Sequence, residues 1–328
     1  MKKILKTSIP PVCTYPGATN LFSILWNNPE KVMPWICDHY IQIALSTGNM
    51  LLNFIEFLKD FSLEHPNYAD TPYSYAVHID WDLQSTDVIG FFKNCIDHDY
   101  YIKATLDRYY FSTCSEYMRQ HYLHQLFIFG YDTDFSVMYG ADFFDRKPYA
   151  DITIPMEEIR TSFVHGVKKE DFHLLKLRDD KHAEGYRTDI ELLRASLEDY
   201  LLSKNTVYKF DYYPAQRGYD IIFGLECYNY ICELPIDRLD VRAFHLLWSN
   251  KILMSLRIKY LSHMYSHVDD NLINFCDKIA AELLLVRNMV LKCRFCPDEQ
   301  LHRRISNKMK EIQEKDRIFI SRLLEILK

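Results

Sequence analysis

A histidine and an aspartate stand at the two ends of a segment that has the pattern of a β-hairpin. In LHQLFIFGYDTDFSVMYGAD, apolar and aromatic residues flank a polar turn at residues 130–134. His124 and Asp142 lie symmetrically about Thr133, so we expect them to face each other directly, with Cβ atoms about 5 Å apart. A carboxylate in that place fixes the tautomer of the imidazole and leaves its second nitrogen free. The hairpin therefore predicts an oriented general base.

Cys13 is the candidate nucleophile for this base. It lies in PPVCTYPGATNLFSIL, just ahead of the first helical pattern. The N-terminus of a helix lowers the pKa of a thiol and can bind a developing oxyanion. Cys13, His124 and Asp142 together supply a nucleophile, a base and an orienting acid, in the chain order Cys, His, Asp. The alternative is an inert cysteine near a helix start.

Both members of the hairpin pair also have structural interpretations. His124 shares a strand face with Leu126 and Ile128, which is typical of a histidine satisfied within the core. Asp142 is placed to cap the following turn or to pair with Arg146. The symmetry of the two positions favours the functional interpretation without excluding the structural one.

The remaining cysteines and histidines do not indicate a metal site. Cys37 and His39 are two residues apart, a spacing that points side chains away from each other on a helix. Cys293 and Cys296 form an isolated C-x-x-C, for which His302 is a possible third ligand. A structural zinc site normally needs four ligands. We therefore predict neither a metal nor a bound cofactor.

Composition limits the class of protein. Of 328 residues, 48% are hydrophobic and 26% charged, as in an ordinary globular chain, and this length favours two domains. The net charge of −6 argues against a general nucleic-acid binder. Neither a signal peptide nor an apolar run of about 20 residues is apparent. Nine scattered cysteines do not indicate a disulfide framework, so we expect a cytoplasmic protein with reduced thiols.

The periodicity predicts a two-part organisation. Helical patterns and strand-like runs are mixed in residues 1–155, which indicates an α+β domain built on an antiparallel meander. The expected helices are 18–26, 34–60 and 88–97, and the expected strands are 100–107, 123–129 and 135–143. Residues 156–328 read as a helical domain. Its expected helices are 156–166, 189–203, 219–233, 238–267, 271–293 and 300–327.

Aromatic content is high, at 15%. Several aromatic clusters either line a cleft for an extended acyl chain or pack in the core and interfaces, and the sequence leaves both interpretations open. The clusters are Tyr73–Tyr75, Tyr100/Tyr101, Tyr109–Phe111 and Tyr208–Tyr213.

The hairpin and several further segments resemble a known family. HQLFIFGYD, then GADFF and PMEEI, together with LFSILWNN, MPWICDHYIQI, IDHDYYIKATLDRYY, FGLECYNYI and FHLLWSNKILMSLRIKYL, run from about residue 10 to residue 265. In order and spacing they resemble the BtrH-like proteins of natural-product gene clusters, which are related to the butirosin biosynthesis acyltransferase. That family is similar to papain-like cysteine peptidases, whose core is a cysteine-bearing helix packed on a small antiparallel sheet.

The resemblance implies an ATP-independent acyltransferase that forms an amide. An acyl or peptidyl group would move from the phosphopantetheine thioester of a carrier protein to an amine. In that pattern Cys13 takes the position of the nucleophile, His124 that of the base and Asp142 that of its orienting acid. A papain-like glutamine is missing from KTSIPPV, the stretch before the cysteine, so a second oxyanion donor must come from elsewhere.

The expected partners follow from the same resemblance. They are an acyl or peptidyl carrier protein and an amine acceptor, without nucleic acid or membrane, and a homodimer is compatible with the long C-terminal helices. Carrier proteins are usually acidic, so docking needs a basic patch, at Lys168/Lys169 or at Arg303, Arg304, Lys308 and Lys310. A cysteine peptidase, which would share the three residues, and a non-catalytic binding or scaffold protein remain alternatives.

Overall fold

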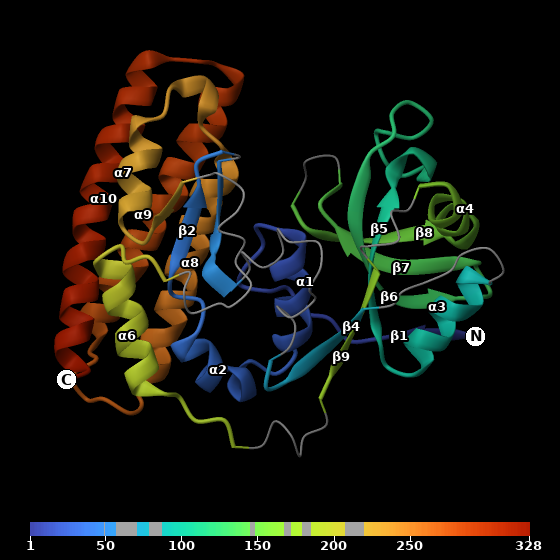
Figure 1. The fold of residues 1–328 in the computed structure, drawn as a ribbon, viewed down its shortest axis with the longest axis horizontal. Coiled ribbons are helices and arrows are strands. Elements are labelled where there is room, and N and C mark those ends of the chain that lie inside the picture. The colour runs from blue at the N-terminus through green and yellow to red at the C-terminus, as the bar shows by residue number, and fades with distance from the viewer. Residues whose placement is uncertain are drawn as a thin grey trace. The chain divides into compact units, whose positions relative to one another are not determined.

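The structure, a computed structural model, describes residues 1–48, 50–56, 71–78, 87–144, 148–166, 172–178, 185–206 and 220–328. In these residues helices combine with antiparallel sheets, as the α+β prediction required (Figure 1). The chain divides into two compact units. Unit 1 comprises residues 1–29 and 60–185, and unit 2 comprises residues 30–59 and 186–328.

Unit 1 is built on one antiparallel sheet with the strand order β4-β9-β5-β6-β7-β8, and β1 pairs with β6. The predicted meander forms its centre as β5, β6 and β7. The strands are β1 (Lys2–Ile4), β4 (Ser74–His78), β5 (Tyr101–Asp107), β6 (Leu123–Asp132), β7 (Val137–Asp142), β8 (Ala150–Pro155) and β9 (Phe172–Leu177).

Among the described residues, three helices pack on this sheet. α1 (Pro16–Leu25) contacts β6, α3 (Val88–Asp97) contacts β5 and β6, and α4 (Met156–Gly166) contacts β5. α1 begins with Pro16 in its first turn, where the missing N–H costs no hydrogen bond. α3 begins at Asp87, whose carboxylate accepts a hydrogen bond from the Gly90 N–H at 2.9 Å. All three helices were predicted from periodicity.

The observed division differs from the boundary expected after residue 155. β9 lies between β4 and β5 in the sheet of unit 1 and is hydrogen-bonded to both. α4 packs on β5 of the same sheet. α4 is therefore attached to unit 1 by packing and β9 by strand pairing, which a helical pattern in the sequence does not reveal.

Unit 2 is mainly helical and carries a small antiparallel sheet of order β10-β2-β3. The predicted helix over 34–60 is wrong at residues 43–46 and 51–54, where β2 and β3 form a hairpin, and residues 57–60 lie outside the described chain. The elements are α2 (Pro29–Asp38), β2 (Ile43–Ser46), β3 (Leu51–Phe54), α6 (Ile190–Leu201), β10 (Ile221–Phe223), α7 (Glu226–Glu233), α8 (Val241–Leu261), α9 (Asp270–Phe295) and α10 (Glu299–Ile326).

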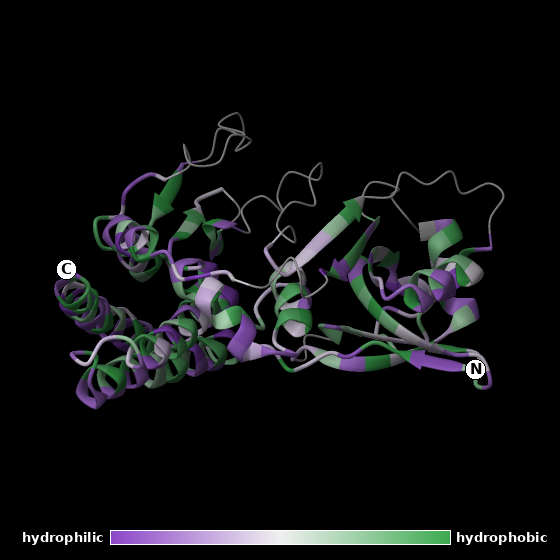
Figure 2. Ribbon diagram, turned by 90° about the horizontal axis from the view of Figure 1, so that it is seen from below, coloured by the Kyte–Doolittle hydropathy of each residue, from purple (hydrophilic) through white to green (hydrophobic). Residues whose placement is uncertain are grey.

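α10, which has 28 residues, is an amphipathic helix. Around the helix that ends at the C-terminus, both hydrophobic and hydrophilic residues are visible (Figure 2). In α10 the buried side chains Leu301, Ile305, Met309 and Ile312 recur at spacings of three and four, which places them on one face. Among the described helices none is sufficiently long and apolar to cross a bilayer.

Candidate active site around His124 and Asp142

His124 and Asp142 meet in unit 1, as predicted, but not through direct opposition. The β6–β7 register pairs Phe127 with Ala141 and Ile128 with Gly140, and it shifts at a bulge before Gly130. Continued by one residue, this register sets Asp142 opposite residue 126, so His124 is its diagonal neighbour. Diagonal neighbours on one face remain within reach of a long side chain. The Nδ1 atom of His124 lies 2.8 Å from Oδ2 of Asp142.

The expected register was wrong because the turn was placed too early. Residues 130–132 continue β6, and the turn lies at residues 133–136. Gly130 and Gly140 are strand residues at which other backbone approaches closely. A Cβ at Gly140 would come within 2.6 Å of the Phe127 carbonyl oxygen. These glycines therefore allow close strand packing instead of forming the turn.

The Asp142 carboxylate is buried and fully engaged. Its Oδ1 atom accepts a hydrogen bond from the Phe143 N–H at 2.7 Å. Its Oδ2 atom accepts one from Arg108 Nη2 at 2.7 Å as well as the contact from His124. Arg108 is itself only 4% exposed and begins the short 3₁₀ turn η4 (Arg108–Tyr110) directly after β5. Asp142 therefore orients an imidazole and neutralises a buried guanidinium at the same time.

The geometry assigns the hydrogen on the His124 ring. Arg108 Nη2 carries two hydrogens, and its two closest acceptors are Asp142 Oδ2 at 2.7 Å and the Phe143 carbonyl at 2.8 Å. It has no third hydrogen for His124 Nδ1, which lies 3.0 Å away. Nδ1 must then carry a hydrogen of its own and donate it to Asp142. In the neutral ring Nε2 then has the lone pair that a general base requires.

The His124 ring is half-buried between aromatic and charged neighbours. It stacks on Tyr122 with centroids 5.7 Å apart, and the Arg108 guanidinium lies 5.5 Å from the same Tyr122 ring. Arg108 also contacts the ring of Phe144 at 4.7 Å. No hydrogen bond to His124 Nε2 occurs in the part of the chain that the structure describes. This nitrogen is thus open to a substrate or a thiol.

Cys13 lies ahead of α1, where the sequence predicts it, but its thiol is not activated in this structure. The helix has its N-cap at Tyr15, and the Cys13 thiol donates instead to the Pro10 carbonyl at 3.3 Å. Burial raises the pKa of Cys13 to about 11. The expected lowering by the helix N-terminus is therefore wrong, because desolvation dominates. Across the described residues no hydrogen bond joins Cys13 to the His124 ring.

Tyr149 connects the surroundings of Cys13 and Asp142, and the sequence analysis gave it no role. It directly precedes β8, next to Ala150, which pairs with Asp142. Burial raises the pKa of Tyr149 well above its ordinary value, and the charges of Asp142 and Cys13 add to this rise. Both groups therefore lie within electrostatic reach of its hydroxyl.

The Tyr149 hydroxyl reaches α1. It donates to Asn20 Oδ1 at 2.8 Å. The other amide atom of Asn20, Nδ2, is buried without a hydrogen-bond partner among the described residues. Asn20 is 1% exposed, so this donor is desolvated.

Sequence signals for these additional residues are weak. Arg108 follows a strand in which every residue is buried, and a charged residue directly after such a strand is the only hint of its role. The alternative pairing of Asp142 with Arg146 lies outside the described residues, as do Tyr208–Tyr213. Other aromatic clusters pack locally. Tyr101, for example, stacks on Phe127 with centroids 5.6 Å apart.

The other cysteines agree with a structural role. All nine are free of disulfides, and Cys37 is fully buried with a pKa raised to about 12, mainly by burial. Cys293 is buried whereas Cys296 is exposed, which separates the two members of the C-x-x-C. Over the described residues no group of three or more His, Cys, Asp or Glu side chains is placed to hold a metal ion.

Comparison of the chain with protein-family models and with curated proteins gives no match. The case for a function therefore depends on the geometry of unit 1.

Proposed function

We propose that the protein is a cysteine-dependent acyltransferase that forms an amide from a carrier-bound thioester. The observation that carries the proposal is the orientation of His124, whose Nδ1 is held by buried Asp142 and whose Nε2 is unoccupied among the described residues. Support also comes from α1, the helix after Cys13, which packs on the histidine-bearing strand β6. A papain-like core with Cys13, His124 and Asp142 as the catalytic residues is part of the same proposal.

The reaction proceeds in two transfers. The Cys13 proton passes to His124 Nε2 while the sulfur attacks the thioester carbonyl, and the carrier thiol leaves with that proton. An amine then attacks the acyl-cysteine and gives its proton to His124, the bond between the acyl carbon and the Cys13 sulfur breaks, and His124 returns the proton to the departing thiolate. Asp142 holds the ring through both steps. Exchange of one thioester for another is nearly isoenergetic, so no ATP is consumed.

Two groups are candidates for stabilising the oxyanion. Backbone N–H groups at the start of α1 follow Cys13 in the chain and belong to a helix N-terminus. The unpartnered amide nitrogen of Asn20 is a buried donor on the same helix, and it supplies what the missing glutamine would provide. Because the free thiol has a raised pKa, activation of Cys13 must follow substrate binding.

A carrier protein would dock on exposed basic residues. Arg304 and Lys310 on α10 are exposed, whereas Lys308 is already bonded to Glu282 and Glu311. Arg303 lies 3.7 Å from Glu299. Lys168 and Lys169 lie outside the described residues. Of the four basic residues expected to form the docking patch on α10, mainly Arg304 and Lys310 are therefore left to contact a carrier protein.

A non-catalytic binding protein is the second candidate. It is favoured by the raised pKa of Cys13 and by the hydrogen bond from Arg108 to the orienting carboxylate. In that case His124, Arg108 and Asp142 form a buried polar network that fixes the end of the hairpin. The two candidates differ in a single observable, the covalent acyl adduct.

The proposal is tested by incubating the full chain with an acyl-loaded carrier protein and measuring intact mass. The expected result is one acyl adduct on the wild type and on Cys296→Ala, which removes an exposed control thiol, and none on Cys13→Ala. Adding an amine should discharge the adduct as amide faster than water hydrolyses it, which separates a transferase from a peptidase. Absence of an adduct, or an adduct that survives Cys13→Ala, contradicts the proposal.

A further inference from the structure

A cavity of about 210 Å³ lies within unit 2, away from the residues assigned above. Because a water molecule occupies roughly 30 Å³ in the liquid, it has room for about seven waters or one small organic molecule. Its walls come from the end of α2, the β2–β3 hairpin, α6 and the segment after α6. The lining residues are Asp38, His39, Gln42, Ile55, Glu56, Leu192, Ser196, Asp199 and Thr206.

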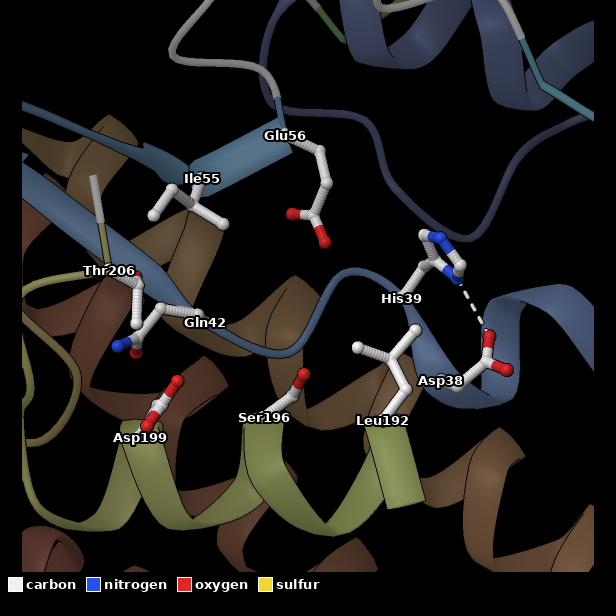
Figure 3. Close-up of a pocket in the computed structure, with 9 residues that line it drawn as sticks. All are labelled: Asp38, His39, Gln42, Ile55, Glu56, Leu192, Ser196, Asp199 and Thr206. Atoms are coloured by element: carbon white, nitrogen blue, oxygen red, sulfur yellow. Dashed lines mark hydrogen bonds and ion pairs between the residues drawn. The ribbon is translucent and has the colours of Figure 1, made fainter. Parts of the chain in front are cut away.

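Polar side chains from opposite walls are directed into this cavity. The Glu56 carboxylate enters from the turn after β3, and Ser196 and Asp199 enter from α6 (Figure 3). The backbone N–H of Tyr40 donates to Glu56 Oε1 at 2.7 Å and so fixes the carboxylate. Its second oxygen, Oε2, is buried and has no hydrogen-bond partner among the described residues.

Two almost fully buried side chains also lack a partner for an oxygen. Gln42 is 4% exposed, and its Nε2 donates to the Lys204 carbonyl at 3.1 Å. That bond fixes which amide atom is which, so Oε1 is the atom without a partner. Thr206 is 2% exposed, and within the described chain its Oγ1 is likewise unpartnered. Buried polar atoms normally have partners, so these oxygens are candidate contacts for a bound molecule that supplies hydrogen-bond donors.

The unpartnered atoms define the chemistry of that ligand. Gln42 Oε1 is an acceptor only, Glu56 Oε2 is an acceptor only when the carboxylate is ionised, and Thr206 Oγ1 belongs to a hydroxyl, which can also accept. Among the described residues the lining contains three carboxylates and neither lysine nor arginine. Two of these carboxylates already have partners, since Asp199 lies 3.4 Å from Lys204 and Asp38 lies 2.7 Å from His39. Glu56 is the lining carboxylate that keeps an unpartnered oxygen among the described residues. A donor-rich, positively charged ligand matches this set.

An ammonium group meets these requirements better than a metal ion. It offers three N–H donors. No cluster of metal-ligating side chains occurs among the described residues. Burial raises the pKa of Glu56, opposed mainly by His39, so a bound cation would also keep this carboxylate ionised.

We propose that this cavity binds a small primary amine, with its ammonium group on Glu56 Oε2 and its remaining polar group near Gln42 and Thr206. The inference is independent of acyl transfer in unit 1. It concerns recognition alone and involves no covalent step. The chemical class is a short aliphatic amine that carries a second polar group.

The test is isothermal titration calorimetry on the full chain at about pH 8, where a carboxylate is more fully ionised. The probes are 4-amino-1-butanol, 1,4-butanediol and 4-hydroxybutyrate, which are similar in size and differ in charge. The amino alcohol is expected to bind, and the other two at least about tenfold more weakly. No heat with the amino alcohol up to about 10 mM, or equal affinity for the diol, would overturn the proposal in favour of a water-filled cavity.

Variants locate the binding. Glu56→Gln removes the charge of the side chain and keeps its shape, and it should weaken binding of the amino alcohol at least about tenfold. Glu198→Gln, on the exposed face of α6, is the matched control and should bind as the wild type does. Equal affinity of the two variants contradicts the assignment. If Glu56→Gln does not fold, Thr206→Val is the second test. Loss of the Thr206 hydroxyl should also weaken binding of the amino alcohol.

Discussion

His124 and Arg108 share one oxygen of Asp142. The three side chains meet at Oδ2, with distances of 2.8 and 2.7 Å from the imidazole and the guanidinium. Arg108 and Asp142 are both buried, whereas His124 is partly exposed. Loss of the buried Arg108–Asp142 pair should therefore reduce stability the most, whereas His124 is the residue with the proposed catalytic role.

Arg108→Met should destabilise the protein by about 3–5 kcal/mol, because it leaves a buried carboxylate without its cation. Urea unfolding followed by circular dichroism measures the change. Arg160→Met is the control, since the Arg160–Glu157 pair is exposed and its loss should leave the unfolding midpoint unchanged. Equal midpoints for the two variants would show that Arg108 does not stabilise Asp142.

Cys13 should be unreactive in the free protein. With a pKa raised to about 11, the thiol is neutral below that pH, and near pH 8 only about one molecule in a thousand carries the thiolate. Its alkylation by iodoacetamide should therefore increase steadily as pH rises toward about 11. Peptide mass spectrometry measures the rate, with exposed Cys296 in the same chain as reference. Faster alkylation of Cys13 than of Cys296 at neutral pH would contradict the burial argument.

At the scale of elements, buried charges join the helices of unit 2. Arg257 of α8 is fully buried and donates to the carbonyls of Ile36, Cys37 and His39. These carbonyls lie at the C-terminal end of α2, where a cation interacts favourably with the helix dipole. Arg257 therefore stabilises the end of α2, from which Asp38 and His39 reach the cavity.

A second buried network links α8 and α10. Lys251 Nζ lies 2.7 Å from Asp316, and both side chains are 0% exposed. The hydroxyls of Tyr200 and Tyr228 donate to the same carboxylate at 2.6 and 3.1 Å. Burial raises the pKa of both tyrosines well above the usual value, so they remain donors.

Asp316→Leu should destabilise unit 2 by about 3–5 kcal/mol, since Lys251 then remains buried without a counter-ion. The double variant Lys251→Met/Asp316→Leu should recover most of that loss, because no buried charge is left unpaired. Thermal and urea unfolding of the wild type, Asp316→Leu, Lys251→Met and the double variant measure the coupling. Strictly additive losses would mean that the two side chains do not act as a pair.

Helices were predicted correctly from the sequence where the spacing of their apolar residues was clear. α4 begins at Met156 and ends at Gly166 as expected, and α8, α9 and α10 follow clear helical spacing. The β2–β3 hairpin was assigned to a helix because MLLNFIEF is a short apolar run in which the two periods cannot be distinguished. β9 was missed for the related reason that its pairing partners lie far away in the chain.

At the scale of the whole molecule, the chain passes between its two units three times, at residues 29–30, 59–60 and 185–186. Each unit is therefore assembled from segments distant in sequence. A cut after residue 155, the boundary expected from sequence, would remove α4 and β9 from the sheet of unit 1. Cuts that keep each unit intact have to fall where the chain passes from one unit to the other.

Sequence alone determined the hairpin, the helix after Cys13, most of the helices and the pairing of His124 with Asp142. These depend on local periodicity, turn residues and helix caps, which neighbouring residues specify. Tertiary structure decided the diagonal register, the insertion of Arg108, the link through Tyr149 and Asn20, the raised pKa of Cys13 and the amine-sized cavity. Each of these depends on burial and on hydrogen bonds between distant segments, and no local pattern encodes them.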